Sequence, residues 1–168
     1  RECLEQTRRA VRALADGGDS PNRDGAGRRS WDEIRGVVGR VRSLGVTVVF
    51  TETGQRADDD AQADLCFVLT REALTNAVRH APALSQVQVS WDHGESAVTV
   101  TVRNDGASGD RGGEDDGCRG GRGGSAEGTG LPRLRDRVEA AGGSLDWGPE
   151  SDGGWRVTAI VPRTRGEG

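Results

Sequence analysis

The chain has 168 residues, which is long enough for one domain with a proper hydrophobic core, and its formal net charge is −4. It carries no basic stripe with interleaved aromatic residues, so we expect no nucleic acid among its partners. Its three cysteines, Cys3, Cys66 and Cys118, are odd in number and form no CxxC pair, which argues against a zinc site or a disulfide framework and favours a reducing cytoplasm.

The first segment, residues 1–16, is predicted to be the end of an amphipathic helix, because Leu4, Val11 and Leu14 share one face. Residues 17–30 are polar and rich in glycine, which predicts a linker. We expect the compact domain to cover residues 31–163.

The linker is followed by a helix, a strand and a long helix. Residues 31–44 show helical spacing of apolar side chains, with Ser30 as the expected N-cap and Glu33 completing a capping box. Residues 46–54 read as a strand, and residues 61–80 as one long helix.

Residues 86–91 and 97–104 alternate strictly between apolar and polar side chains, which predicts a β-hairpin. The turn between them, residues 92–96, contains His93, which we expect to be exposed to solvent. Residues 107–127 are a low-complexity loop with almost no apolar side chains, either an inert insertion or a lid that closes over a bound nucleotide.

The last part of the chain is predicted to form a helix over residues 131–141 and two closing strands, residues 144–147 and 155–162, with Gly142 and Gly143 ending the helix. The helix residues expected to face inward are Leu131, Leu134, Val138 and Ala141. This order of elements predicts an α/β fold, a two-layer sandwich with about three helices on one face of a mixed β-sheet.

The long helix carries an unusual polar face in its second half, where Glu72, Asn76, Arg79 and His80 lie opposite Leu74. A solvent-facing surface is the ordinary explanation for such a stripe. Asparagine, however, is a poor residue for a helix interior, because its side chain competes for backbone hydrogen bonds. A carboxylate and an amide one turn apart suit Mg²⁺ with its waters, and the basic residues a turn further on suit phosphates.

A second candidate site lies at the start of the last helix, where Gly128 and Gly130 precede it and Pro132 occupies its first turn. Free backbone N–H groups at such a helix terminus bind phosphate well. A plain junction between a loop and a helix explains the same pattern at least as often.

Together these segments resemble the ATP-binding domain of sensor histidine kinases, the Bergerat fold shared with gyrase B and the heat-shock chaperone ATPases. Residues 71–81 (REALTNAVRHA) resemble the N box, residues 98–106 (VTVTVRNDG) the G1 box, and residues 128–145 the G2 box with its helix. The spacing within the last segment is most similar to the nitrate and desaturase sensors. The resemblance covers the chain from about residue 31 to residue 162.

The resemblance implies a role for each matching residue. Glu72 would be catalytic, polarising a metal-bound water or the incoming acceptor, and would hold Mg²⁺ together with Asn76. Arg79 and His80 would reach the phosphates. The residues that would hold adenine are Asn104, Asp105 and Gly106. Those that would wrap the triphosphate are Gly128, Thr129, Gly130 and Leu131.

The chain departs from the family pattern at several positions. Asn104 stands where the G1 box has an aspartate, and Trp155 where a threonine is usual. Strand alternation predicts that Asn104 points inward to read the base and Asp105 points outward. The alternative is that Asp105 bends inward and Asn104 merely starts a turn. The phospho-acceptor histidine is also missing, and we expect it just before Arg1, since residues 1–16 look like the end of the dimerisation hairpin.

The resemblance implies the catalytic domain of a two-component sensor kinase, which uses ATP and Mg²⁺ to phosphorylate a histidine upstream of this sequence and thence a response regulator. The other expected partner is the dimerisation hairpin of the same kinase, as a homodimer. The expected location is the cytoplasm, with any membrane contact through a region outside this sequence. The alternatives are an anti-sigma-factor-type serine kinase and a nucleotide-binding regulatory module without transferase activity.

Overall fold

The computed structural model describes residues 31–80, 84–106 and 130–164. Its elements are the 3-10 turn η1 (Trp31–Glu33), the helices α2 (Ile34–Ser43), α3 (Asp60–His80) and α4 (Gly130–Ala140), and the strands β1 (Thr47–Gly54), β2 (Gln86–His93), β3 (Ala97–Asn104), β4 (Ser144–Pro149) and β5 (Trp155–Pro162). The predicted amphipathic helix, the linker and the low-complexity loop lie outside the described residues.

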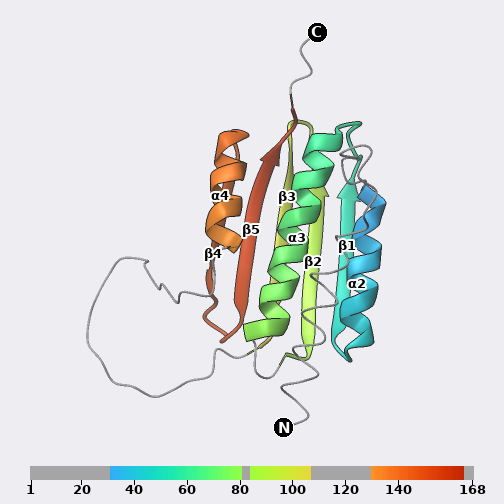
Figure 1. Ribbon diagram of the computed structural model, residues 1–168, viewed down its shortest axis with the longest axis vertical. Coiled ribbons are helices and arrows are strands. Elements are labelled where there is room, and N and C mark those ends of the chain that lie inside the picture. Colours follow the sequence, from blue (N-terminus) through green and yellow to red (C-terminus); the bar gives the residue numbers. More distant parts are fainter. Residues whose placement is uncertain (1–30, 81–83, 107–129, 165–168) are drawn as a thin grey trace, which may run out of the picture.

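Five strands form one sheet in the order β1-β2-β3-β5-β4. β1 pairs with β2 in parallel, whereas the remaining pairs are antiparallel. The parallel pair is joined through α3, because parallel neighbours need a long crossover connection. All three helices lie on one face of the sheet (Figure 1). The predicted two-layer sandwich with a mixed sheet is therefore confirmed.

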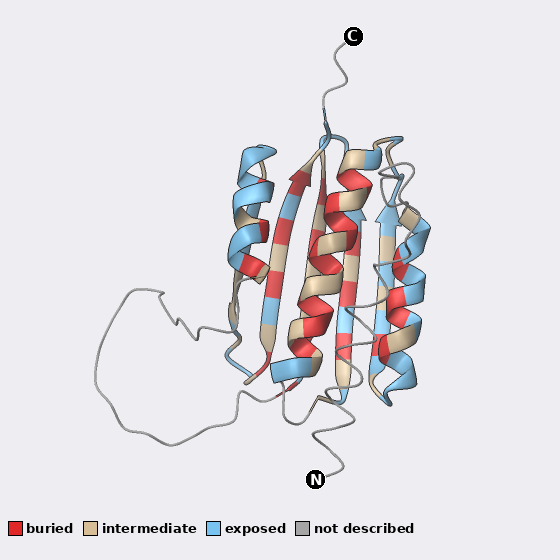
Figure 2. Cartoon of the chain, viewed as in Figure 1, coloured by how far each residue is buried: buried red, intermediate tan, exposed pale blue. Residues whose placement is uncertain are grey.

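The core lies between the helices and the sheet. β2 and β3 bury every second residue, as their apolar alternation predicts. Along α3 and β5 buried residues also recur at intervals (Figure 2). Trp91 is fully buried, and its Nε1 donates to Thr70 Oγ1 on α3 at 3.0 Å. The opposite face of the sheet carries no helix among the described residues, and its side chains are polar or partly exposed.

His93 corrects one prediction. It is not an exposed turn residue, because β2 continues two residues beyond Trp91 and the alternation places His93 inward. Its side chain is 1% exposed, and its Nε2 lies 2.8 Å from Glu52 Oε1. Its ring packs edge-on against Trp31, with the centroids 4.9 Å apart. The actual turn is shorter, closed by a hydrogen bond from Gly94 N to Ala97 O at 2.9 Å.

The end of α4 corrects a second prediction. Ala141 is exposed rather than facing inward, because the helix has already ended at Ala140. Gly142 has φ of 86°, a left-handed conformation that glycine adopts without strain. Gly143 N then donates to Val138 O at 2.8 Å, which closes the helix as the glycine pair predicts.

The start of α2 differs from the predicted capping box. Ser30 lies outside the described residues, and Glu33 is itself the N-cap, with no side-chain cap hydrogen bond. The reason is that η1 runs directly into α2, so Glu33 has helical backbone angles, with φ of −63° and ψ of −23°. Along the described part of the chain, no helix has the length and apolar character needed to cross a membrane.

Candidate nucleotide-binding site

The polar stripe of α3 begins inside the protein and ends in solvent. Glu72 and Asn76 are half-buried, whereas Arg79 and His80 are exposed. The stripe covers about 12 Å at the α-helical rise. The stripe therefore presents a carboxylate and an amide that are half-buried, followed by two basic side chains in solvent. A metal-bound polyphosphate would need its ligands in this order.

The structure brings this stripe into contact with the start of α4. A Cβ atom at position 130 would overlap Oε1 and Cδ of Glu72 and would lie 3.0 Å from its Cγ. Only a glycine allows this approach, so Gly130 is required by the Glu72 side chain rather than by backbone strain. Two motifs separated by almost sixty residues in the sequence thus meet at one point.

The G1 segment has the orientation that alternation predicts. Asn104 is 7% exposed and shares the inward face of β3, whereas Asp105 is exposed. The Asp105 carboxylate accepts hydrogen bonds from Ser85 N at 3.1 Å, from Gln86 N at 2.8 Å and from the Ser85 hydroxyl. The Ser85 hydroxyl, followed by these backbone N–H groups, lowers the pKa of the Asp105 carboxyl below its usual range. Asp105 therefore ties the start of β2 to the end of β3.

Asn104 keeps an unused acceptor. Its Oδ1 is buried and has no hydrogen-bond partner among the described residues. A buried acceptor left unpaired costs about 1–3 kcal/mol, so a ligand that donates to it would recover that energy. Gly106, two residues further on, is also buried. The arrangement fits a base with an exocyclic amino group.

The structure describes only some of the other residues predicted to bind the triphosphate or the metal. Leu131 is buried in the core, so only its backbone N–H at the start of α4 could serve a phosphate. Gly128 and Thr129 lie outside the described residues. Within the described residues, no group of three or more His, Cys, Asp or Glu side chains could hold a metal ion. Glu72 and Asn76 nevertheless fit Mg²⁺, because that ion usually keeps several waters and takes its other ligands from phosphates.

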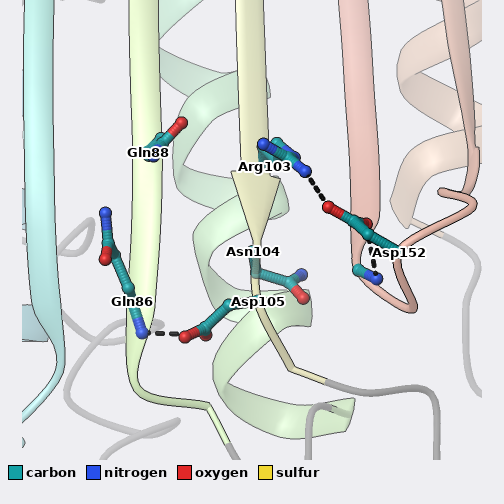
Figure 3. A pocket seen from close by; sticks show the side chains of 7 residues that line it. Gln86, Gln88, Arg103, Asn104, Asp105 and Asp152 are labelled. Atoms are coloured by element: carbon teal, nitrogen blue, oxygen red, sulfur yellow. Dashed lines mark hydrogen bonds and ion pairs between the residues drawn. The ribbon is translucent and has the colours of Figure 1, made fainter.

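A separate depression of about 260 Å³ lies on the helix-free face of the sheet (Figure 3). It is lined by Gln86, Gln88, Arg103, Asn104, Asp105, Asp152 and Gly154. Arg103 is already paired there with the carboxylates of Glu150 and Asp152. Of the predicted site residues, Asn104 and Asp105 border this depression, whereas Glu72, Asn76 and Gly130 do not line it.

The sequence did not reveal two parts of this arrangement. Ser85 binds Asp105 across twenty positions, and nothing in its local sequence marks it. Gly154 belongs to the β4–β5 hairpin, and a Cβ atom there would lie 2.5 Å from Asn104 O. The glycine-rich run before Trp155 is a signal of close backbone approach, although its partner strand could not be deduced from it.

The fold and the converging motifs define an ATPase domain of the two-layer sandwich type. Residues 61–165 match the family described as histidine kinase-, DNA gyrase B-, and HSP90-like ATPase. The match covers more than half of the chain, which therefore belongs to this family. Membership implies ATP as the ligand.

Individual proteins agree with this assignment. The chain is 26% identical over 165 residues to the sensor histidine kinase YxjM of Bacillus subtilis (strain 168), a match that covers 96% of this chain and 35% of that protein. It thus spans about a third of the length of that relative. A histidine kinase domain from the Erythrobacter litoralis EL346 blue-light activated histidine kinase has the same fold, with a TM-score of 0.54 and 19% identity over 96% of this chain and 80% of that one.

Proposed function

We propose that the chain is the ATP-binding catalytic domain of a sensor histidine kinase, which passes the γ-phosphoryl group of ATP to a histidine upstream of this sequence. The observation that carries the proposal is the contact between Glu72 and Gly130. It places a carboxylate of the N box against the helix start of the G2 box, as a phosphate site between them requires. The phosphoryl group would then pass to a response regulator, and the upstream hairpin would supply the homodimer contact.

The chain's own residues would act mainly by position and charge, as is usual in phosphoryl transfer. Asn104 would accept a hydrogen bond from the base, with Asp105 and Gly106 shaping the turn beside it. Asn76 and Glu72 would hold Mg²⁺, which neutralises phosphate charge when bound. Glu72 would polarise the acceptor or a metal-bound water, since a carboxylate accepts a proton or a hydrogen bond.

The phosphate contacts would come from two directions. Arg79 and His80 at the end of α3 would reach the outer phosphates through charge-assisted hydrogen bonds. Backbone N–H groups at the start of α4, from Gly130 and Leu131, would bind from the other side, with Gly128 and Thr129 completing the loop.

Calorimetry with ATP and Mg²⁺ tests the proposal. Asn76→Ala should abolish the magnesium-dependent part of ATP binding while leaving thermal unfolding unchanged. The matched control is Gln88→Ala, an exposed residue of the depression on the helix-free face, which should bind ATP as the wild type does. Equal ATP affinity in the wild type and Asn76→Ala would refute the proposed site, and a loss in Gln88→Ala would move it to the other face.

Asn104, which replaces the family's aspartate, favours a second function, a regulatory module that binds the nucleotide without transferring its phosphate. The two functions separate when γ-labelled ATP is added to the chain with a hairpin fragment that carries the acceptor histidine. The kinase should label that fragment and leave His80 and His93 unlabelled, whereas a regulatory module should bind ATP without labelling anything.

A further inference from the structure

Trp155 is the first residue of β5 and lies directly opposite Asn104 in the antiparallel β3–β5 pair. Side chains directly opposite each other on one face have Cβ atoms about 4.5–5.5 Å apart. Val157, Ala159 and Val161 of β5 are buried against the helices, and Trp155 shares their face by alternation. The indole ring is therefore beside the Asn104 side chain, on the same face of the sheet as Glu72 and Asn76.

The other three tryptophans have polar or aromatic partners. Trp31 donates from Nε1 to Ala57 O at 3.1 Å, and Trp91 donates to Thr70. The Trp147 ring lies under the guanidinium of Arg135, 4.3 Å from the ring centroid. Trp155 is half-buried and packs against the edge of the hydrophobic core, but within the described ranges it has neither a hydrogen bond nor an aromatic or cation contact, and part of its ring stays exposed. A large ring left without such contacts is available to a ligand.

The hairpin that carries Trp155 is firmly attached to β3. Because a Cβ atom at position 154 would lie 2.5 Å from Asn104 O, Gly154 lets the two backbones approach closely. Glu150 N donates to Gly154 O at 2.8 Å across the hairpin, and Arg103 pairs with both Glu150 and Asp152. These contacts hold the start of β5 against Asn104, so the indole is presented from a rigid support rather than from a loose turn.

Among the described helices, only α3 reaches this end of β5 (Figure 1). α4 lies over β4 and beside the upper part of β5, so it does not cover the strand's lower end (Figure 1). α3 brings its second half, with Asn76, to that region. A ligand seated there would have Asn104 at its edge and the indole of Trp155 against it.

We propose that Trp155 is a stacking residue of the base subsite, an inference that rests on the proposed function. Stacking on an aromatic ring tolerates any base, because every base has a π-face. The amide of Asn104 can both accept and donate, unlike a carboxylate. The pair therefore defines a subsite that binds purines strongly through the ring face and discriminates weakly between adenine and guanine through the edge.

The test compares Trp155→Ala, Trp155→Phe and the control Trp147→Phe by calorimetry with ATP, GTP and inorganic tripolyphosphate, each with Mg²⁺. Trp155→Ala should weaken ATP and GTP alike, by roughly 10-fold or more, and leave tripolyphosphate unchanged, since only the base contacts the ring. Trp155→Phe should keep most of the affinity. The ATP-dependent change in tryptophan fluorescence should disappear in Trp155→Phe and persist in Trp147→Phe.

The outcomes distinguish a failure of the stacking role from a failure of the proposed kinase function. ATP affinity that is unchanged or tighter in Trp155→Ala, with normal wild-type binding, overturns the stacking role and leaves the kinase assignment standing. An equal loss for tripolyphosphate also overturns it, because the effect would then come from a distorted site. If the wild type binds neither ATP nor tripolyphosphate, the proposed function itself fails.

Discussion

Replacing Gly130 with alanine isolates the contact on which the proposed site depends. The new Cβ would overlap Oε1 and Cδ of Glu72, so the carboxylate would have to move by about 1 Å or more to reach ordinary van der Waals distance. The end of a glutamate side chain can make that movement by turning about 30° away from a staggered rotamer, at a cost of about 0.5–1.5 kcal/mol. Gly130 is the first residue of α4, where the interior advantage of alanine over glycine, about 1 kcal/mol, applies only in part, so the net change in the free energy of unfolding should be small.

The effect on phosphoryl transfer should be much larger than the effect on stability. Misplacing a catalytic group by about 1 Å can slow a reaction by about 100-fold. We therefore expect Gly130→Ala to melt within a few degrees of the wild type and to bind ATP with modest loss. Its transfer of label from γ-labelled ATP to a hairpin fragment should fall by about two orders of magnitude.

Gly39→Ala is the matched control. Gly39 lies in α2, it is exposed, and a Cβ atom there would meet nothing within 4 Å. The same chemical change should stabilise the domain slightly through helix propensity and leave transfer unchanged. Wild-type transfer by Gly130→Ala would show that the Glu72 carboxylate is not needed at the start of α4, and the proposed assembly of the site would be wrong.

Two further predictions concern the base and the pH dependence of stability. Asn104→Ala should weaken ATP binding by about 1–3 kcal/mol, and Asn104→Asp should keep the affinity for ATP and bind GTP more weakly. If nucleotide titrations instead show unchanged ATP affinity in Asn104→Ala and a loss in Asp105→Ala, this assignment is wrong. Hydrogen bonds from Arg56, and next from His93, lower the pKa of Glu52 below its ordinary value of 4.5. The contribution of Glu52 to stability is therefore complete above that value and is lost as the pH falls through the lower pKa of the folded state. Denaturant titrations should therefore show that Glu52→Gln is less stable than the wild type near about pH 6 and that the difference narrows below about pH 4; a constant difference would mean that Glu52 is not the titrating group.

The regular parts of the fold could be predicted because each element carries its own period. β2 and β3 alternate without a break, α3 is apolar nearly all round in its first half, and the glycine pair after α4 marks its end. The predictions that failed lie at element ends. The residues around His93, Asp92 and Gly94, are typical of a turn, whereas the alternation that starts at Val87 places His93 inward. A buried imidazole needs a partner, and Glu52 lies 41 positions away in the sequence.

The candidate site was predictable in its chemistry but not in its assembly. Glu72 and Asn76 stand out on a helix because they interrupt its propensity, and the inward position of Asn104 follows from strand period. No local pattern shows that Gly130 must accommodate the Glu72 side chain, or that Trp155 lies opposite Asn104. Both contacts depend on how distant segments pack against each other, and the periodicity of a single sequence does not reveal that packing.

Asn104 belongs to two ladders at once, opposite Val87 in β2 and opposite Trp155 in β5. Since side chains alternate with a period of two, a slip of one residue in β3 would turn Asn104 to the helix-free face. The same slip would expose the buried valines of β3 on that face. Inserting or deleting a single residue in β3 should therefore be far more damaging than any substitution in that strand. Over evolutionary time, length changes should be confined to the turns, while position 104, the proposed base contact, stays free to vary between asparagine and aspartate without disturbing the sheet.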